Sequence, residues 1–292
     1  MYVSTLLCNP AQPCLESATV DALRGAWGGG EARWLAPGIA AEFDMPAIPD
    51  NRWQVWQEMQ GLGLDLIVQP AAGRRKRMLL ADMDSTMIGQ ECIDELADVA
   101  GVGARVKEIT ARAMNGELDF EAALRERVGL LKGLDAAVID RVMEERITFT
   151  PGGRVLIATM KAAGGHAALV SGGFTAFTER VAAALGFDEH RANTLLIEDG
   201  RLTGAPGEPI LGRAAKVSAL HEITARLDLT AADVLAVGDG ANDLGMLELA
   251  GAGVALHAKP SVAAQCEIRI NHGDLTALLY LQGYAQGEFA GV

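Results

Sequence analysis

Short apolar runs, spaced along residues 78–292 and separated by stretches with helical periodicity, constrain the fold of this chain more than any other feature. Strands that alternate with helices are typical of a parallel sheet covered by helices on both faces. The carboxyl ends of such strands meet at one edge, where ligands bind. The predicted strands are Met78–Ala81, Ala167–Val170, Val234–Val237, Gly253–Leu256 and Ile268–Ile270.

A long helical stretch interrupts this alternation after the first strand. No strand pattern occurs between Thr86 and Thr150, and glycine-containing breaks separate the helical segments. We predict a helical cap inserted at about 87–148, above the sheet edge at which the first strand ends. A hairpin is predicted further along, at 195–202. The predicted cap helices are Glu91–Ala100, Val106–Met114, Phe120–Leu131 and Asp135–Arg146.

Residues 1–72 have a different pattern, in which the order of elements is βαββαβ. All four tryptophans of the chain fall in this segment, which indicates a small separate core. We therefore predict two domains, an α+β domain at 1–72 and an α/β core at 78–292. In the first domain, the predicted strands are Tyr2–Leu7, Ala32–Leu35, Ile39–Phe43 and Leu64–Val68, and the predicted helices are Ser17–Trp27 and Arg52–Gln60.

The composition limits the partners of the protein. The net charge of -13 argues against a nucleic-acid partner, because phosphate backbones are bound by clustered Lys and Arg. No apolar stretch approaches the roughly 20 residues of a membrane span. The four cysteines show neither disulfide nor zinc spacing. These features favour a cytoplasmic protein with no membrane and no nucleic-acid partner.

The segment DMDST, at 82–86, places two acids directly after the first apolar strand. Neighbouring carboxylates repel each other and a buried unpaired charge is costly, so a cation or a reaction is expected there. Three further pieces fall at the ends of predicted elements: VSGGF at 170–174, Lys216 at the start of a helix and GDGAND at 238–243. Each piece alone is common as a cap, a turn or a solvated lysine. Together, at one sheet edge, they predict an active site.

These four pieces resemble the motifs of the haloacid dehalogenase superfamily of phosphoryl-transfer enzymes, which have a Rossmann-like parallel sheet. The resemblance implies that Asp82 is a nucleophile that forms an aspartyl phosphate and that Asp84 is the general acid and base. It also implies a Mg2+ cofactor, which prefers oxygen ligands. The implied ligands are Asp82, the backbone carbonyl of Asp84 and Asp239, with Asp243 supporting the site without binding the ion.

The transferring phosphoryl group carries negative charge that needs donors placed in advance. Three groups fit this need in the sequence. Ser171 supplies a hydroxyl, Gly172 supplies a backbone N–H that no Cβ obstructs, and Lys216 supplies a positive charge.

The match becomes closer along 78 to about 280, where four stretches resemble the phosphoserine phosphatase family. This resemblance implies hydrolysis of O-phosphoserine to serine and phosphate, a step of serine biosynthesis. The stretches are DMDSTMIGQECIDELA, AMNGELDFEAALRERVGLLKG, VSGGF and GDGANDLGML.

A phosphoserine substrate presents an ammonium and a carboxylate in addition to its phosphate. Glu91 suits the ammonium and Arg127 suits the carboxylate, although a first-turn acid and a solvated arginine would look the same in sequence. By the family resemblance, Met114 and Phe120 wall the pocket and Asn242 contacts the substrate or its phosphate.

Two other functions fit the same core residues. One is a phosphotransferase that passes the phosphoryl group from phosphoserine to an alcohol such as homoserine. The other is a phospho-aspartate sensor, against which Asp84 argues, because an acid and base beside the nucleophile shortens the life of the phosphorylated state.

The βαββαβ order of the N-terminal domain resembles the ferredoxin-like fold of ACT regulatory domains. This resemblance implies that the domain senses serine. Homodimerisation through this domain, or a purely stabilising role, fits the same pattern.

Overall fold

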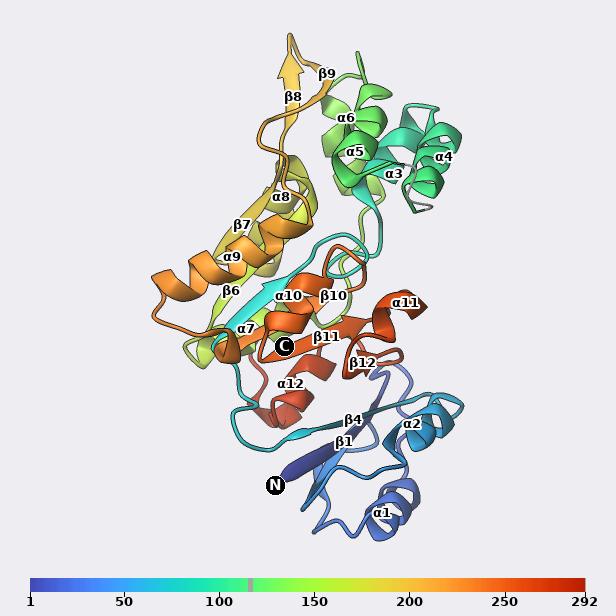
Figure 1. The fold of residues 1–292 in the computed structure, drawn as a ribbon, viewed down its shortest axis with the longest axis vertical. Helices are drawn as coiled ribbons and strands as arrows, with labels where there is room; N and C mark the ends of the chain where they lie inside the picture. The colour runs from blue at the N-terminus through green and yellow to red at the C-terminus, as the bar shows by residue number, and fades with distance from the viewer. Residues whose placement is uncertain (115–117, 292) are drawn as a thin grey trace.

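The computed structural model describes residues 1–114 and 118–291, and the side chains of residues 113 and 114 lie outside it. Three parts follow one another along the long axis of the molecule: a small N-terminal sheet with its helices, a larger central sheet, and a group of helices (Figure 1). The predicted fold class is confirmed, because the central sheet is parallel and the N-terminal sheet is antiparallel. Within the described ranges, no helix is long and apolar enough to cross a membrane.

The central sheet has six strands, all parallel: β5 (Met78–Ala81), β6 (His166–Phe174), β7 (Glu189–Asn193), β10 (Val234–Gly238), β11 (Ala252–Leu256) and β12 (Ile268–Ile270). Their order is β12-β11-β10-β5-β6-β7. Successive side chains of a strand point to opposite faces. In β5, Leu79 packs in one hydrophobic cluster and Leu80 in another, so both faces of this strand are buried. This explains why the run is wholly apolar.

Helices cover both faces of the sheet, as the alternating pattern predicts. The cluster that contains Leu79 includes side chains of α7 (Gly153–Ala162), α8 (Thr175–Leu185) and α12 (Ala277–Leu281). The cluster that contains Leu80 includes side chains of α9 (Arg213–Arg226), α10 (Leu244–Leu249) and α11 (Pro260–Ala263).

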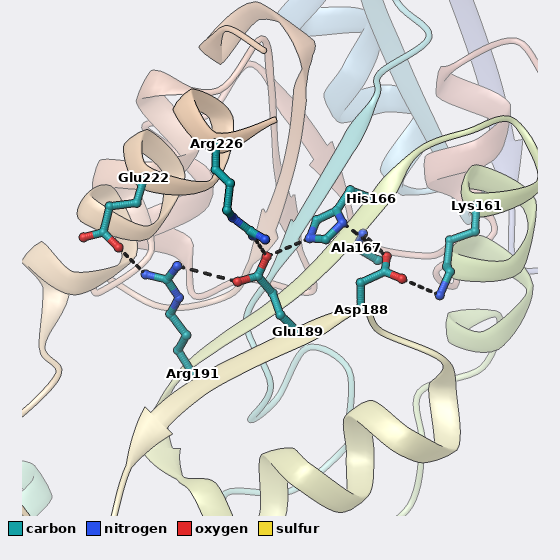
Figure 2. Close-up of polar contacts among 8 residues, drawn as sticks. All are labelled: Lys161, His166, Ala167, Asp188, Glu189, Arg191, Glu222 and Arg226. Carbon is teal, nitrogen blue, oxygen red and sulfur yellow. Dashed lines mark hydrogen bonds and ion pairs between the residues drawn. The ribbon is translucent and has the colours of Figure 1, made fainter. Parts of the chain in front are cut away.

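β7 is a strand that the sequence does not predict. Its residues, EHRAN, include a single apolar side chain, and the strand lies at the edge of the sheet, paired with β6. Polar contacts hold its beginning, where Glu189 is hydrogen-bonded to His166 of β6 and ion-paired with Arg226 of α9 (Figure 2). Arg191 in turn pairs with Glu222 at 2.6 Å. Charged side chains thus replace the apolar ones by which the other strands are recognised.

The N-terminal sheet contains β1 (Tyr2–Cys8), β2 (Arg33–Ala36), β3 (Ala40–Met45) and β4 (Leu64–Pro70), in the order β2-β3-β1-β4. One face packs with side chains of α1 (Ser17–Ala26) and α2 (Arg52–Gln60). The elements follow one another as βαββαβ, which is the predicted order.

The other face of the N-terminal sheet packs against the C-terminal part of the chain. Leu7 of β1 and Ile67 of β4 belong to the same buried cluster as Leu278 and Tyr280. The side chain of Gln69 donates a hydrogen bond to the carbonyl of Leu281 at 2.7 Å. The two sheets are therefore joined by a shared hydrophobic core as well as by the connecting chain.

A buried acid, Asp65 of β4, completes this joint. Its Oδ1 accepts a hydrogen bond from the backbone N–H of Asn271 at 2.8 Å. Its Oδ2 accepts hydrogen bonds from the backbone N–H groups of His272 and Gly273 at 3.0 and 2.8 Å. These three residues follow β12, so one side chain of the N-terminal sheet fixes a loop of the central part.

The helical cap contains α3 (Cys92–Val99), α4 (Gly103–Met114), α5 (Phe120–Gly129) and α6 (Ala137–Glu145), where four helices are predicted. The two segments that connect it to the core pair with each other: Gly89 donates a backbone hydrogen bond to Thr148 at 2.9 Å, and Thr150 donates one to Met87 at 3.0 Å. The chain thus enters and leaves the cap through a single paired connection.

The hairpin of β8 (Leu195–Glu198) and β9 (Arg201–Pro206) projects beside the cap (Figure 1). The backbone N–H of Gly133 donates to the carbonyl of Leu202 at 2.8 Å, and the N–H of Leu202 donates to the carbonyl of Leu134 at 2.9 Å. The hairpin therefore binds the connection between α5 and α6 and gives the cap a second attachment to the core.

Candidate active site

The predicted catalytic segments converge at the carboxyl edge of the central sheet. β5 leads into Asp82, β10 leads into Asp239, and Ser171 lies within β6. β5 pairs with both β10 and β6, so the three strands carry these side chains to neighbouring positions. All three residues are buried.

Lys216, in the first turn of α9, bridges two of the acids. Its Nζ lies 2.6 Å from Oδ1 of Asp82 and 2.5 Å from Oδ1 of Asp243, and its side chain is 2% exposed. Burial alone would lower the pKa of Lys216, but the two carboxylates outweigh it and raise the pKa to about 12. The lysine is therefore held as a cation.

A third carboxylate, that of Asp239, lies close to the two that Lys216 bridges. Asp82, Asp239 and Asp243 each offer one oxygen, and these oxygens lie within 4.8 Å of one another. Burial raises the pKa of Asp82 well above its ordinary value; Lys216 opposes the shift and Asp243 adds to it. Burial, reinforced by Asp243, also raises the pKa of Asp239 to about 6. The site thus holds more negative charge than its own cation offsets.

This donor set fits a hard divalent cation, because Mg2+ prefers oxygen ligands and is commonly bound through one or two carboxylates. Asp243 is already engaged on both oxygens, since Oδ1 contacts Lys216 and Oδ2 accepts a hydrogen bond from the Gly240 N–H at 3.0 Å. Asp82 and Asp239 are therefore better placed than Asp243 to bind an ion. Ligation by the backbone carbonyl of Asp84 stays a prediction.

Asp84 is held between the cap and the core. Its Oδ1 accepts a hydrogen bond from the N–H of Cys92, the first residue of α3, at 3.0 Å. Its Oδ2 accepts a long hydrogen bond, 3.5 Å, from the Ser171 hydroxyl. Burial, reinforced by the charge of Glu91, raises the pKa of Asp84 to about 7. A carboxyl group with this pKa can both give and take a proton near neutral pH.

The segment VSGGF brings the next group of predicted residues together. β6 continues through it to Phe174, so the expected strand end at Val170 is wrong; the register with β7 shifts between these two residues. Gly173 donates its N–H to Ser171 Oγ at 2.8 Å. A Cβ on Gly173 would lie 2.6 Å from Oδ2 of Asp84, so a glycine is needed for this close approach.

Phe120, the first residue of α5, brings the cap down onto this segment. A Cβ on Gly172 or on Gly212 would lie 3.3 Å from its ring. Phe120 therefore packs against Gly172, one of the predicted phosphate-binding groups, and against Gly212, the N-cap of the helix that carries Lys216.

Two further residues of the cap that the sequence selects, Glu91 and Arg127, lie near the acids. Glu91 accepts a hydrogen bond at 2.8 Å from Ser85 Oγ, and Ser85 itself has a left-handed backbone with φ of 55°. Burial lowers the pKa of Arg127, and the charges of Asp94, Glu91 and Asp84, in that order, oppose the change. An acid and a guanidinium thus occur on the cap side of Asp84.

Asn242 and Met114 complete the predicted set. Asn242 is half-buried in the loop between Asp239 and Asp243. The side chain of Met114, a predicted wall of the pocket, lies outside the described residues. The roles of both in substrate binding stay predictions.

Sequence reasoning missed three polar groups that hold the site. They are the N–H of Cys92, the hydroxyl of Ser85 and the side chain of Asn193, which is buried and hydrogen-bonded to Gly172. Ser85 lies inside the DMDST motif, so the motif itself offered a signal. Asn193 follows no apolar run and belongs to no motif, so its position in the sequence gave none.

Comparison with known proteins agrees with this geometry. Residues 79–248 match the family model of the haloacid dehalogenase-like hydrolases. A phosphoserine phosphatase of Streptomyces coelicolor is 43% identical over 256 residues, which are 86% of this chain and 62% of that protein. The chain therefore spans less than two thirds of the length of that relative.

Solved structures extend the likeness to three dimensions. A hydrolase of the same family from Salmonella enterica serovar Typhi superimposes with a TM-score of 0.87 at 31% identity. The superposition covers 96% of this chain and 98% of the Salmonella chain. A phosphoserine phosphatase solved as an analogue of its phospho-aspartyl intermediate gives a TM-score of 0.66 at 40% identity and covers 70% of this chain and 98% of its own. The chain belongs to the haloacid dehalogenase-like hydrolase family, and within that family it is similar to phosphoserine phosphatases.

Proposed function

We propose that this protein hydrolyses O-phosphoserine to serine and phosphate. The observation that carries the proposal is the buried cluster in which Lys216 bridges Asp82 and Asp243 beside Asp239. Similarity to a phosphoserine phosphatase that has been solved as a phospho-aspartyl analogue supports the same chemistry. Serine biosynthesis as the pathway, and the cytoplasm as the location, stay predictions.

The reaction takes place in two displacements at phosphorus. In the first, a carboxylate oxygen of Asp82 bonds to phosphorus, the bond to the serine oxygen breaks, and Asp84 gives its proton to that oxygen. In the second, Asp84 takes a proton from a water molecule, whose oxygen bonds to phosphorus and releases the Asp82 carboxylate. A pKa of about 7 for Asp84 suits both steps, because neither protonation state is strongly disfavoured near neutral pH.

Charge stabilisation comes from groups that are fixed before the substrate binds. Lys216, the Ser171 hydroxyl and the Gly172 N–H face the transferring phosphoryl group. Asp82, the Asp84 carbonyl and Asp239 would hold Mg2+, with Asp243 supporting Lys216 and the loop that follows β10. The bound ion would neutralise the crowded carboxylates and the phosphate oxygens.

Specificity for phosphoserine is assigned to the cap. Glu91 binds the substrate ammonium and Arg127 binds its carboxylate, while Phe120 and Met114 wall the pocket and Asn242 contacts the phosphate. The hydrogen bond from Ser85 supports the orientation of Glu91. Closure of Phe120 over Gly172 excludes water while the aspartyl phosphate forms.

We also propose the division of the chain into an ACT-like domain at 1–72 and a phosphatase core at 78–292, with the cap at about 87–148. Serine sensing or homodimerisation through the first domain stays a prediction. The shared core and the Asp65 contacts support a firm attachment of this domain rather than a free one.

A phosphate-release screen over small phosphomonoesters tests the proposed function. The screen includes both enantiomers of phosphoserine, phosphoethanolamine, which lacks the carboxylate, and acceptor alcohols such as homoserine. We expect release that needs Mg2+, stops with a chelator and is fastest with phosphoserine. Replacing Arg127 by Lys should raise KM for phosphoserine and leave phosphoethanolamine unaffected, because only phosphoserine has the carboxylate. The proposal would be refuted if none of the esters released phosphate in the presence of Mg2+.

A further inference from the structure

Asn193 is the last residue of β7 and lies between two segments of the candidate site. Its side chain is buried, with 1% of the residue exposed. The Nδ2 group donates hydrogen bonds to the carbonyls of Gly172 at 2.9 Å and Leu211 at 3.2 Å. The Oδ1 atom accepts a hydrogen bond from the N–H of Leu211 at 2.7 Å. One side chain thus binds the end of β6 to the segment that leads into α9.

We propose that Asn193 is a positioning residue for phosphoryl transfer, acting through the Ser171 hydroxyl. The inference rests on the proposed function, since Ser171 is assigned there to the phosphoryl group. Asn193 touches no reacting atom; its effect passes through the backbone of the segment VSGGF.

The path from Asn193 to Ser171 is a short series of contacts. The carbonyl of Gly172, which accepts from Asn193, belongs to the same planar peptide unit as the N–H of Gly173. That N–H donates to Ser171 Oγ at 2.8 Å. Fixing the carbonyl therefore fixes the N–H, and an acceptor bond on Oγ leaves the hydroxyl hydrogen free to be donated. Oδ2 of Asp84, 3.5 Å from Ser171 Oγ, is within reach as an acceptor for this hydrogen.

The second arm of Asn193 reaches the helix that carries Lys216. Leu211 precedes Gly212, the N-cap of α9, and Lys216 lies in the first turn of that helix. Bonds to both the N–H and the carbonyl of Leu211 hold this approach to α9 at a fixed distance from the Ser171 segment. The same bonds fix the orientation of the Asn193 carboxamide, and with it the bond to the Gly172 carbonyl.

Contacts at both ends of β7 hold the strand that carries Asn193. At the beginning of the strand, Glu189 pairs with His166 and Arg226, so β7 is tied both to β6 and to α9 (Figure 2). At its end, Asn193 bonds to β6 and to the segment that leads into α9. A carboxamide is needed there because it offers donors and an acceptor together. A carboxylate keeps the acceptor for Leu211 but faces two carbonyls without a hydrogen to donate.

The first test compares Asn193→Asp with Thr194→Ala, a neighbouring exposed position, in Mg2+-loaded full-length protein. We expect kcat for phosphomonoester hydrolysis to fall about 10- to 100-fold in Asn193→Asp, because small misplacements of catalytic groups have effects of this size. The control Thr194→Ala should keep the wild-type rate. Mg2+ affinity, measured by calorimetry, should stay within about twofold of wild type in both variants, because Asn193 contacts none of the acids.

A double-mutant cycle with Ser171→Ala separates positioning from a general loss of structure. Ser171→Ala alone should cost about 100-fold in kcat, since one donor is lost. If Asn193 acts through this hydroxyl, adding Asn193→Asp should cost at most a further threefold or so, rather than its full effect. If the double variant instead loses kcat by the product of the two single losses, the inference is overturned.

Failure of the variant to fold and lack of activity in the wild type need separate tests. If Asn193→Asp does not fold, the cycle is repeated with Asn193→Ser, which removes the bonds without adding charge; failure of both variants to fold would assign Asn193 to stability and reject the positioning role. If the wild type hydrolyses no phosphomonoester, the proposed function fails separately, and binding of inorganic phosphate with Mg2+ becomes the readout. Equal phosphate affinity in wild type and Asn193→Asp would then reject the inference.

Discussion

Two of the regions that hold buried carboxylates in this molecule differ in what surrounds the acids. At the joint between the sheets, Asp65 accepts hydrogen bonds from three backbone N–H groups, at 2.8 to 3.0 Å. At the carboxyl edge of the central sheet, Asp82 and Asp243 share one lysine, and Asp239 lies beside them. The first acid is supplied with donors, whereas the others compete for one cation.

The pKa shifts express the same difference. Burial raises the pKa of Asp65, and each of the other influences on it, from the N–H groups and from His272, lowers the pKa. Burial also raises the pKa of Asp82, but there Asp243 and Asp84 add to the shift while Lys216 opposes it. A buried acid with donors all around it holds a fold together. Buried acids that raise one another's pKa are kept for a ligand or a reaction.

The largest effect is expected when Asp82 is replaced by Asn. The side chain keeps its shape but loses the nucleophilic oxygen, so phosphate release should fall by at least about a thousandfold. Without Mg2+, the melting temperature should stay the same or rise, because one of the competing charges is gone. Initial-rate assays and thermal unfolding in chelator measure the two effects. Full activity in this variant would show that Asp82 does not bond to phosphorus.

The opposite result is expected when Asp65 is replaced by Ala. Three backbone N–H groups lose a buried acceptor, at about 1 kcal/mol each, so the free energy of unfolding should fall by about 3 kcal/mol. Activity at 25 °C should stay within about threefold of wild type. The exposed acid Asp50, replaced by Asn, is the control and should leave the denaturant midpoint unchanged. A normal midpoint with lost activity in Asp65→Ala would reverse the comparison between the two regions.

Addition of Mg2+ should distinguish the two regions without changing the wild-type sequence. An ion at 100 times its Kd stabilises the folded protein by about 2.7 kcal/mol. The melting temperature of the wild type and of Asp65→Ala should therefore rise with Mg2+. The rise should be much smaller in Asp239→Asn, which loses a charged ligand. An equal rise in Asp239→Asn would place the ion elsewhere.

Most of the fold could be predicted from the sequence because buried strands require runs of apolar residues. β5, β10 and β11 are apolar and are predicted at or near their observed bounds, since both faces of the sheet are covered. β7 was missed because an edge strand held by ion pairs carries no such pattern. The extension of β6 through two glycines was missed because Gly-Gly usually signals a loop.

The site could be predicted only where its residues belong to a motif. The structure brings Lys216 into contact with both Asp82 and Asp243, as the predicted convergence of their motifs at one sheet edge suggests. Asn193 and Asp65 bind backbone groups that lie 18 or more positions away in sequence, and nothing in their immediate neighbours records those partners. A polar side chain that serves distant backbone becomes visible only when the chain has folded.

The smallest effect is expected at the beginning of β7, where a third kind of acid, Glu189, is only half-buried. Glu189→Gln keeps the shape but removes the charge that pairs with Arg226 and that strengthens the hydrogen bond with His166, and partly exposed pairs contribute about 1 kcal/mol or less. Burial by itself would raise the pKa of Glu189, but hydrogen bonds from His166 and Arg226 outweigh it and lower the pKa.

The sign of this shift fixes the pH dependence of the effect. Because the folded pKa of Glu189 lies below that of the unfolded chain, about 4.3, the ionised group stabilises the fold above that pH. The contribution is lost as the pH falls through the folded pKa. The difference in unfolding free energy between wild type and Glu189→Gln should therefore be present at pH 7 and shrink in acid, as denaturant titrations at several pH values can measure. A constant difference would mean that Glu189 acts by packing, as a neutral side chain would, and not by charge.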